Sequence, residues 1–397
     1  MDNSRRRFVK SVAAGSAGIA IGGLGFNASS YGRIIGSNDR IRVGIIGFSD
    51  RCRSSLLPAF LSQSQELNFE IAAVSDIWSK RREDAEQFFN GKGIKVALAR
   101  NNEELYERKD TDAVIISTAD FQHARHAIDA VKAGRDLYVE KPFAETMEDN
   151  RDALKAIQES GKIFQIGSQR RSGANYIAAN EYIRSGKFGE ILMVEMSWNV
   201  NQPGRWRRPD LVASIREQDT DWKRFLINRP DAPWNPRHYL EYRLFWPYSS
   251  GIPGQWMSHQ IDTVHWFTGL SHPRSVAANG GIYLWKDGRE NADTMTAVFD
   301  YGPSDDRKKG FQVVYSSRFT NSFGGTKELY FSNAGMLNLD KNTITPDGGL
   351  QAEEARAMNM QPNLLEAMKL PETSVVTGAN TGSDPMTNAH MRNWMRV

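Results

Sequence analysis

Short β-branched and aliphatic runs alternate with amphipathic helical stretches through residues 40–166, and this alternation constrains the fold most. The first run, "RIRVGIIG" at residues 40–47, ends at a glycine and leads into a helical stretch. A buried strand that ends in a glycine turn is how a dinucleotide-binding fold begins. Repetition of the pattern predicts a doubly wound parallel sheet. The other predicted strands are "FEIAAVSD", "IKVALA", "TDAVIISTA", "RDLYVEKP" and "KIFQIG", with charged or amphipathic helices between them, two of them at 79–90 and 146–160.

The second half of the chain has a different pattern. Loops rich in Trp, Tyr and Pro fill residues 198–250, and the later segments alternate between apolar and polar residues. Such alternation is typical of antiparallel strands with one face in water. The sequence therefore predicts an α/β chain in three parts. They are a leader and linker (1–38), an N-terminal Rossmann domain (39–166) and a C-terminal α+β substrate and oligomerisation domain with a mostly antiparallel open sheet (167–397).

The last residues, "NAHMRNWMRV", are typical of a helix that has not reached a C-cap. This pattern predicts that the C-terminal domain is truncated.

Composition narrows the function classes. The 397 residues carry 50 Lys+Arg against 47 Asp+Glu, so the formal net charge is only +3. This balance argues against a general nucleic-acid binder, which needs a concentrated basic surface. The single cysteine, Cys52, excludes an intramolecular disulfide and a Cys-based zinc site.

The N-terminus carries an export pattern. Residues 4–10, "SRRRFVK", match the twin-arginine consensus S-R-R-x-F-x-K, and a Gly/Ala-rich apolar run follows. That run is too short and too rich in glycine for a confident membrane span. We expect export by the twin-arginine machinery to the periplasm, without stable membrane insertion afterwards. The alternative is a basic tail with an apolar patch.

The glycine turn departs from the G-x-G-x-x-G fingerprint. Gly47 is in place, whereas Ser49 and Cys52 occupy the other two glycine positions. The Ser49 hydroxyl can donate to a phosphate oxygen, and a buried Cys52 behaves as a small hydrophobic residue. Asp50 is unfavourable beside a pyrophosphate, and we expect the arginines that flank Cys52 to offset its charge. The turn therefore predicts a cofactor site with substituted glycines.

Asp76 ends the second predicted strand, in "AVSDIW". An acid at this position can accept hydrogen bonds from the ribose hydroxyls and would repel a 2′-phosphate, so it favours NAD over NADP. The basic residues 80–82 nearby leave NADP open. The alternative role for Asp76 is to cap the following helix.

Two further segments place polar groups at strand ends. Ser117 and Thr118 end a predicted strand, and ligands of open α/β folds bind at such strand ends. His123 lies five residues further on, and a second histidine comes three residues after it. A structural role for this histidine pair is favoured over metal binding. In "YVEKPFA", Glu140 and Lys141 end a buried strand ahead of Pro142. Lys141 can hold a substrate hydroxyl, and Pro142 fixes the turn through a restricted or cis peptide; the alternative is a surface Glu–Lys pair.

Together these motifs resemble the Gfo/Idh/MocA oxidoreductases, a family that includes glucose-fructose oxidoreductase and inositol dehydrogenase. The resemblance is carried by "GIIG", "DAVIIST…H", "AGRDLYVEKP", "IGSQRR" and "GQWMSHQIDTVHWFTG", in this order. The loop "TDWKRFL…YRLFW…SGIPGQW" resembles an exported branch of the family. The resemblance implies an N-terminal Rossmann domain that binds NAD(P) and a C-terminal domain that supports the substrate and a homo-oligomer.

The resemblance also implies roles for individual residues. Lys141 matches the lysine that contacts nicotinamide and substrate, His259 matches the acid/base histidine or its partner, and Asp262 matches the final acid of D-x-G-x-H-x-x-D. The first acid of that pattern falls on Gln255, which cannot take a proton at any useful pH. A buried core histidine is the alternative for His259.

The sequence thus predicts an exported NAD(P)-dependent oxidoreductase that acts on a sugar, cyclitol or glycoside hydroxyl, with a tightly held and internally recycled cofactor. The alternatives are a transient-redox enzyme that cleaves or epimerises glycosides and a non-catalytic cofactor- or sugar-binding sensor. The predicted catalytic residues are Lys141 and His259. Cofactor contacts are predicted for Gly47, Ser49, Asp76, Ser117, Thr118, His123, Glu140 and Lys141, and substrate contacts for Lys141, Arg170, Arg171, Gln255, His259 and Asp262.

Overall fold

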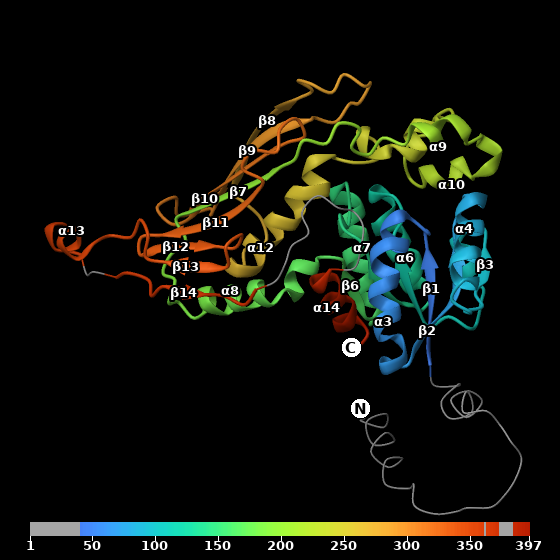
Figure 1. Ribbon diagram of the computed structural model, residues 1–397, viewed down its shortest axis with the longest axis horizontal. Helices are drawn as coiled ribbons and strands as arrows, with labels where there is room; N and C mark the ends of the chain where they lie inside the picture. Colours follow the sequence, from blue (N-terminus) through green and yellow to red (C-terminus); the bar gives the residue numbers. More distant parts are fainter. Residues whose placement is uncertain (1–39, 361–362, 373–383) are drawn as a thin grey trace, which may run out of the picture. The chain divides into compact units, whose positions relative to one another are not determined.

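The N-terminal half of the protein is built on a parallel sheet. The computed structural model describes residues 40–360, 363–372 and 384–397, so the twin-arginine motif lies outside the described residues. The first sheet has six strands in the order β3-β2-β1-β4-β5-β6, and every neighbouring pair is parallel (Figure 1). This order confirms the predicted doubly wound Rossmann fold. The strands are β1 (Ile41–Ile46), β2 (Phe69–Ser75), β3 (Ala97–Ala99), β4 (Ala113–Ile116), β5 (Asp136–Val139) and β6 (Phe164–Ile166).

Helices connect these strands, and local capping explains where two of them begin. The Asn101 side chain accepts the backbone N–H of Glu104 at 2.9 Å, and that of Thr146 accepts the N–H of Asp149 at 3.1 Å. Both bonds satisfy donors that a first helical turn leaves open. The helices are η1 (Cys52–Leu56), α3 (Leu57–Leu67), α4 (Ser79–Asn90), α5 (Asn102–Tyr106), η2 (Asp120–Gln122), α6 (His123–Lys132) and α7 (Met147–Ser160).

The second sheet is mixed and mostly antiparallel, as predicted. Its eight strands follow the order β14-β13-β12-β11-β7-β10-β9-β8, and the β7–β10 pair is the parallel one. Alternate side chains of the central strands are buried, which gives the sheet one packed face. The strands are β7 (Met193–Asn199), β8 (Ser275–Gly281), β9 (Thr294–Tyr301), β10 (Phe311–Arg318), β11 (Thr326–Ser332), β12 (Gly335–Asn338), β13 (Thr343–Thr345) and β14 (Met368–Lys369).

Two helices cover the packed face of this sheet. Figure 1 shows α8 (Ala174–Arg184) and α12 (Ser258–Thr268) on the side of the sheet nearer the parallel sheet. Their apolar residues share one core with β10 and β11. A π-helical turn, η6 (Pro253–Met257), leads directly into α12. The remaining short helices are η3 (Gln169–Ser172), α9 (Pro209–Ser214), η4 (Glu217–Asp219), α10 (Trp222–Leu226), α11 (Pro236–Leu240), η5 (Tyr242–Leu244) and α13 (Ala352–Ala357). In the described part of the chain, no helix is long and apolar enough to cross a membrane.

The last helix, α14 (Pro385–Trp394), packs on the first half of the chain. Its buried residues Met391 and Trp394 belong to the hydrophobic cluster of β1, β2 and α3. The Trp394 ring lies 6.1 Å from that of Phe69 and 5.9 Å from that of Tyr138. The N–H of Met395 bonds to the carbonyl of Met391, which continues the helical hydrogen bonding past Trp394. The C-terminal helix is therefore part of the hydrophobic core of the parallel sheet.

Replacement of Trp394 by alanine is expected to destabilise the protein. Because the ring is 4% exposed, its loss leaves a cavity between the terminal helix and the sheet. Such large-to-small substitutions cost about 3–5 kcal/mol. Urea denaturation followed by circular dichroism measures the change, with the exposed Arg396→Ala as the control. A loss below about 1 kcal/mol would show that this helix contributes little to the core.

Candidate active site

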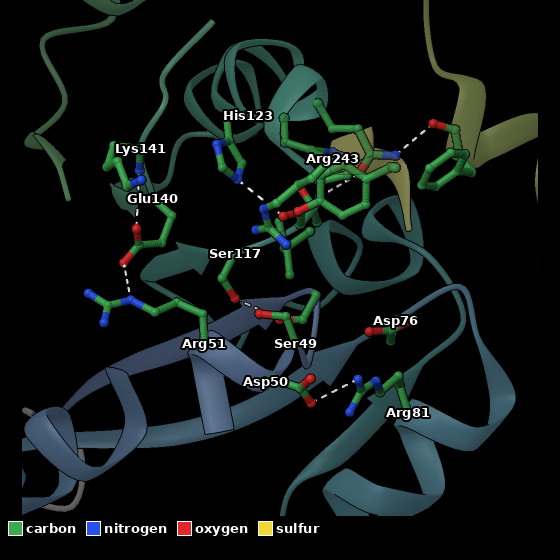
Figure 2. Close-up of a pocket in the computed structure, with 18 of the residues that line it drawn as sticks. Ser49, Asp50, Arg51, Asp76, Arg81, Ser117, His123, Glu140, Lys141 and Arg243 are labelled. Carbon is green, nitrogen blue, oxygen red and sulfur yellow. Dashed lines mark hydrogen bonds and ion pairs between the residues drawn. The ribbon is translucent and has the colours of Figure 1, made fainter. Parts of the chain in front are cut away.

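A cavity of about 730 Å³ opens at the carboxyl ends of β1, β4 and β5 and continues beneath η6 and α12. Its volume is in the range of small-molecule and cofactor sites. The structure brings eleven of the thirteen predicted site residues to its wall, some of which are seen in Figure 2. These are Gly47, Ser49, Asp76, Ser117, Thr118, His123, Glu140, Lys141, Arg170, Gln255 and His259.

Gly47 lies at the point where the strand order of the parallel sheet reverses, between β1 and β4. Its N–H donates to the carbonyl of Ser75 at 2.8 Å, and its own carbonyl accepts the Ser117 hydroxyl at 2.8 Å. Its φ is +86°, and a Cβ here would lie 2.8 Å from Cγ2 of Thr118. The turn therefore requires glycine for both its conformation and its packing.

Replacement of Gly47 by alanine is expected to weaken cofactor binding at least about tenfold, because the turn must move away from Thr118. Titration with NADH, followed by fluorescence, measures the dissociation constant. Gly93→Ala is the matched control, since φ is +68° there and no atom lies within 4 Å of the added Cβ. Equal losses in both variants would assign the effect to backbone strain in general.

The two substituted glycine positions are accommodated differently. Ser49 Oγ accepts the backbone N–H of Cys52 at 3.2 Å, in the first turn of the helical stretch that begins at Asp50. The Cys52 side chain is fully buried in the core of the parallel sheet, and burial raises the pKa of its thiol to about 12. The expectation that Cys52 is a small apolar packing residue is confirmed.

Asp50 is neutralised by arginines from three segments. Its carboxylate lies 2.9 Å from Arg81, as Figure 2 shows, and it lies 3.5 Å from Arg208 and 3.6 Å from Arg53. Burial alone would raise the pKa of Asp50, but these cations outweigh it and hold the pKa below its usual value. The expectation that both neighbouring arginines offset Asp50 is wrong for Arg51, which pairs instead with Glu140 at 3.0 Å.

Asp76 is tied to the glycine turn. Its Oδ2 accepts the N–H of Phe48 at 2.8 Å and its Oδ1 accepts that of Trp78 at 2.9 Å. Burial raises the pKa of this carboxyl, and the two backbone bonds counteract the rise. Because a carboxylate has about four lone-pair positions, acceptor capacity remains toward the cavity.

These features fit a dinucleotide. Gly47 permits close backbone approach, and Asp76 offers a carboxylate for ribose hydroxyls. Thr118 lines the cavity, and its hydroxyl is buried with no hydrogen-bond partner among the described residues. A buried polar atom of this kind needs a partner, which a ligand can supply.

His123 is buried and its neighbour His126 is half-buried, and both lie on the cavity wall. Nδ1 of His123 lies 2.7 Å from the carbonyl of Pro142, and its Nε2 lies 3.3 Å from that of Thr118. Burial lowers the pKa of His123 and lowers that of His126 to about 4, so both rings are neutral at pH 7. His123 thus braces the turn that follows Lys141, where the predicted cis peptide is present between Lys141 and Pro142.

Lys141 and His259, the two predicted catalytic residues, both line the cavity. Lys141 Nζ donates to the backbone carbonyl of Gln255 at 2.6 Å. Burial lowers the pKa of Lys141 to about 8, although Glu140 and Asp120 act in the opposite direction. Burial and then the charge of Lys141 hold the pKa of His259 well below its usual range. The site thus pairs an amine that titrates near neutrality with a neutral imidazole.

Four residues around Gln255 were missed by the sequence reasoning. Asp120, Tyr242, Arg243 and Ser249 form a partly buried polar network with the Gln255 side chain. Asp120 could have been found, because it lies two residues after the Ser117–Thr118 strand end. The others come from the aromatic loops, where sequence offers no periodicity.

The arginines predicted for substrate have separate partners. Arg170 is buried and forms an ion pair with Glu328 of β11. Arg171 binds Asp262 through two hydrogen bonds of 2.8 Å, and neither of these two residues lines the cavity. The predicted substrate contacts of Arg171 and Asp262 therefore stay predictions without support from the cavity geometry, whereas Arg170 lies on the cavity wall with Glu328 as its partner.

Comparison with known proteins agrees with this geometry. Residues 41–168 match the model of an oxidoreductase family with an NAD-binding Rossmann fold, GFO_IDH_MocA. The chain is 30% identical over 200 residues to 1,5-anhydro-D-fructose reductase of Ensifer adhaerens, with 48% of this chain and 58% of the relative covered. It is 26% identical over 305 residues to a glycosyl hydrolase family 109 protein of Shewanella pealeana, with 72% and 62% covered.

A solved structure of levoglucosan dehydrogenase, in complex with NADH and levoglucosan, shares the fold over 90% of each chain. Its TM-score to this protein is 0.61 at 15% sequence identity. The matched region spans about three fifths of the curated relatives, at 58% and 62% of their lengths. Residues 41–168 are therefore an NAD-binding Rossmann domain of the Gfo/Idh/MocA type.

Proposed function

We propose that this chain, which carries a Gfo/Idh/MocA-type NAD-binding Rossmann domain, is an NAD-dependent oxidoreductase that acts on a hydroxyl of a sugar or cyclitol. The main observation behind this proposal is that Lys141 and His259 line the same cavity as Gly47 and Asp76. The sugar-type names of the relatives support the substrate class. NAD is the favoured cofactor, and NADP stays open because Arg81 and Arg82 lie beside Asp76.

In this reaction Lys141 and His259 have different roles. When bound, NAD supplies the hydride acceptor for the carbon that bears the hydroxyl. Lys141, as the free amine, takes the hydroxyl proton while that carbon becomes a carbonyl. The neutral His259 imidazole lies on the same wall and holds the hydroxyl by a hydrogen bond. The hydride and the proton thus leave the substrate by separate routes.

Export and cofactor retention belong to the same proposal. The twin-arginine pattern at Ser4–Lys10 would send the folded protein to the periplasm. Because free nicotinamide cofactor is not expected to cycle outside the cytoplasm, the cofactor would be held tightly and regenerated on the enzyme. The second sheet would support a homo-oligomer.

A second candidate function is glycoside cleavage by transient redox chemistry. It is favoured by the likeness to a glycosyl hydrolase family 109 protein, which aligns with 72% of this chain. In that case the hydride would return to the same sugar after elimination or epimerisation through a keto-sugar. No net change in cofactor would accompany turnover.

A sugar and glycoside panel tests both functions. The purified protein is mixed with NAD, and absorbance at 340 nm and product masses are recorded together. An accumulating keto-sugar with rising absorbance supports net oxidation, whereas a cleaved or isomerised glycoside at constant absorbance supports the second candidate. A panel without any product, and with a Lys141→Ala variant that behaves like the parent, would favour a non-catalytic sensor.

A further inference from the structure

Asp120 is a buried acid that the proposed chemistry does not use directly. Its side chain is 1% exposed and receives donors from separate segments of the second half of the chain. Oδ1 accepts the Tyr242 hydroxyl at 3.2 Å and faces the Arg243 guanidinium at 3.5 Å. Oδ2 accepts the Ser249 hydroxyl at 2.7 Å and the side-chain amide of Gln255. One carboxylate from η2, the turn that follows β4, therefore organises three segments around the cavity.

Gln255 connects this carboxylate to the reactive residues. Its Oε1 accepts Nε of Arg243 at 2.9 Å, its Nε2 donates to Asp120, and its backbone carbonyl accepts Lys141 Nζ. It lies in the π-helical turn η6, which runs directly into the helix of His259. The oxygen and the nitrogen of the Gln255 side-chain amide are thus both held by hydrogen bonds. These bonds also hold in place the backbone carbonyl of Gln255, which accepts Lys141 Nζ.

We propose that Asp120 is the positioning residue of the site, and that it holds the Lys141 amine and the His259 helix in place through Gln255. The proposal rests on the proposed oxidoreductase function for its catalytic meaning. Asp120 does not line the cavity, so it acts through Gln255 and not on the substrate. A buried carboxylate that receives several donors also fixes its partners more firmly than a neutral acceptor does.

The charged groups around Lys141 set its pKa, which can be measured. Burial lowers the pKa of Lys141, Glu140 and Asp120 raise it, and Arg243 and Arg51 lower it. Loss of the Asp120 charge must therefore move the pKa of Lys141 further down.

Asp120 acts on its other titratable neighbours in the same way. Burial raises the pKa of Glu145 to about 7 and Asp120 adds to that rise, whereas Asp120 counteracts the lowering of the His123 pKa by burial. Both of these pKa values should also fall in the absence of the Asp120 charge.

The test is Asp120→Asn. This variant keeps the shape of the side chain but removes its charge, and it places an amide N–H group against the groups that donate to Asp120. Competitive labelling of lysines with trace acetic anhydride, read by mass spectrometry across a pH series, follows Lys141 in the protein with NAD and without substrate. We expect the labelling midpoint near pH 8 in the parent and a lower midpoint in Asp120→Asn. The matched control is Asp112→Asn, which removes a half-exposed carboxylate paired with Arg42 and should leave the midpoint in place.

Turnover is the second measurement. With a sugar that the parent oxidises, kcat of Asp120→Asn should fall on the order of 100-fold while KM changes little, because the reacting groups are displaced and not the binding surface. An unmoved Lys141 midpoint would overturn the proposal whether or not any sugar is turned over. A moved midpoint with no active sugar in the parent would instead count against the proposed function alone.

Should Asp120→Asn fail to fold, Gln255→Met tests the same link. This variant keeps the Asp120 charge and removes the amide that joins it to η6. We expect kcat to fall at least about tenfold, with the Lys141 labelling midpoint close to that of the parent because the Asp120 charge is retained. A parental kcat in this variant would show that Gln255 does not transmit the positioning.

Discussion

Replacement of Lys141 by methionine should lower kcat about 1,000-fold while the dissociation constant for NADH stays within about threefold of the parent. Methionine keeps the length of the side chain but cannot accept the hydroxyl proton. The parent should show kcat/KM for oxidation that rises with pH and levels near pH 8, since burial brings the pKa of Lys141 to about 8 and the free amine is the active form. Stopped-flow absorbance at 340 nm over a pH series measures both quantities.

Two variants sharpen this result. Lys141→Arg retains a cation but cannot lose its proton at any accessible pH, so it should be as impaired as Lys141→Met if the amine is a base. Lys155→Met removes an exposed lysine of α7 and should keep parental kinetics. An active Lys141→Arg would show that Lys141 supplies charge, and the assignment of the proton acceptor would then pass to His259.

The sequence predicted the parallel sheet well because its signals are local. The strand that ends at Gly47, the helix over residues 79–90 and the "EKP" turn each depend on hydrophobic periodicity or on turn-forming residues close in sequence. The structure has β1 and α4 at these positions. Strand β8 (Ser275–Gly281) was missed because "SVAANGG" consists mostly of small residues, six of which are exposed, so no apolar alternation marks it.

The part of the site that was predicted from the sequence also depends on local signals. Residues at strand ends, such as Ser117 and Lys141, were found from local pattern and line the cavity. Asp120, Tyr242 and Arg243 meet only through tertiary packing, and their network joins positions more than 100 residues apart. Sequence shows which of these side chains are polar, but it does not show which of them are buried together.

Arg170 illustrates how burial changes the interpretation of a charged residue. It was predicted to bind substrate because an arginine on a loop beside the expected pocket, here in "QRRSGANY", suits hydrogen bonds to sugar hydroxyls or carboxylates. In the structure it is 5% exposed and forms an ion pair with Glu328, which also accepts the Tyr176 hydroxyl at 3.1 Å and the Thr263 hydroxyl at 2.6 Å. Its main expected role is therefore to join η3 to the second sheet.

Arg170→Met should accordingly destabilise the protein by about 3–5 kcal/mol, because it leaves the Glu328 carboxylate buried without its cation. Urea denaturation measures the loss, and the double variant Arg170→Met/Glu328→Leu is the control that removes both charges. We expect the double variant to recover most of the stability, since two apolar residues of similar size can replace a buried pair. If Arg170→Met instead kept parental stability and raised only KM for the sugar, Arg170 would be a substrate ligand, as the sequence pattern alone predicted.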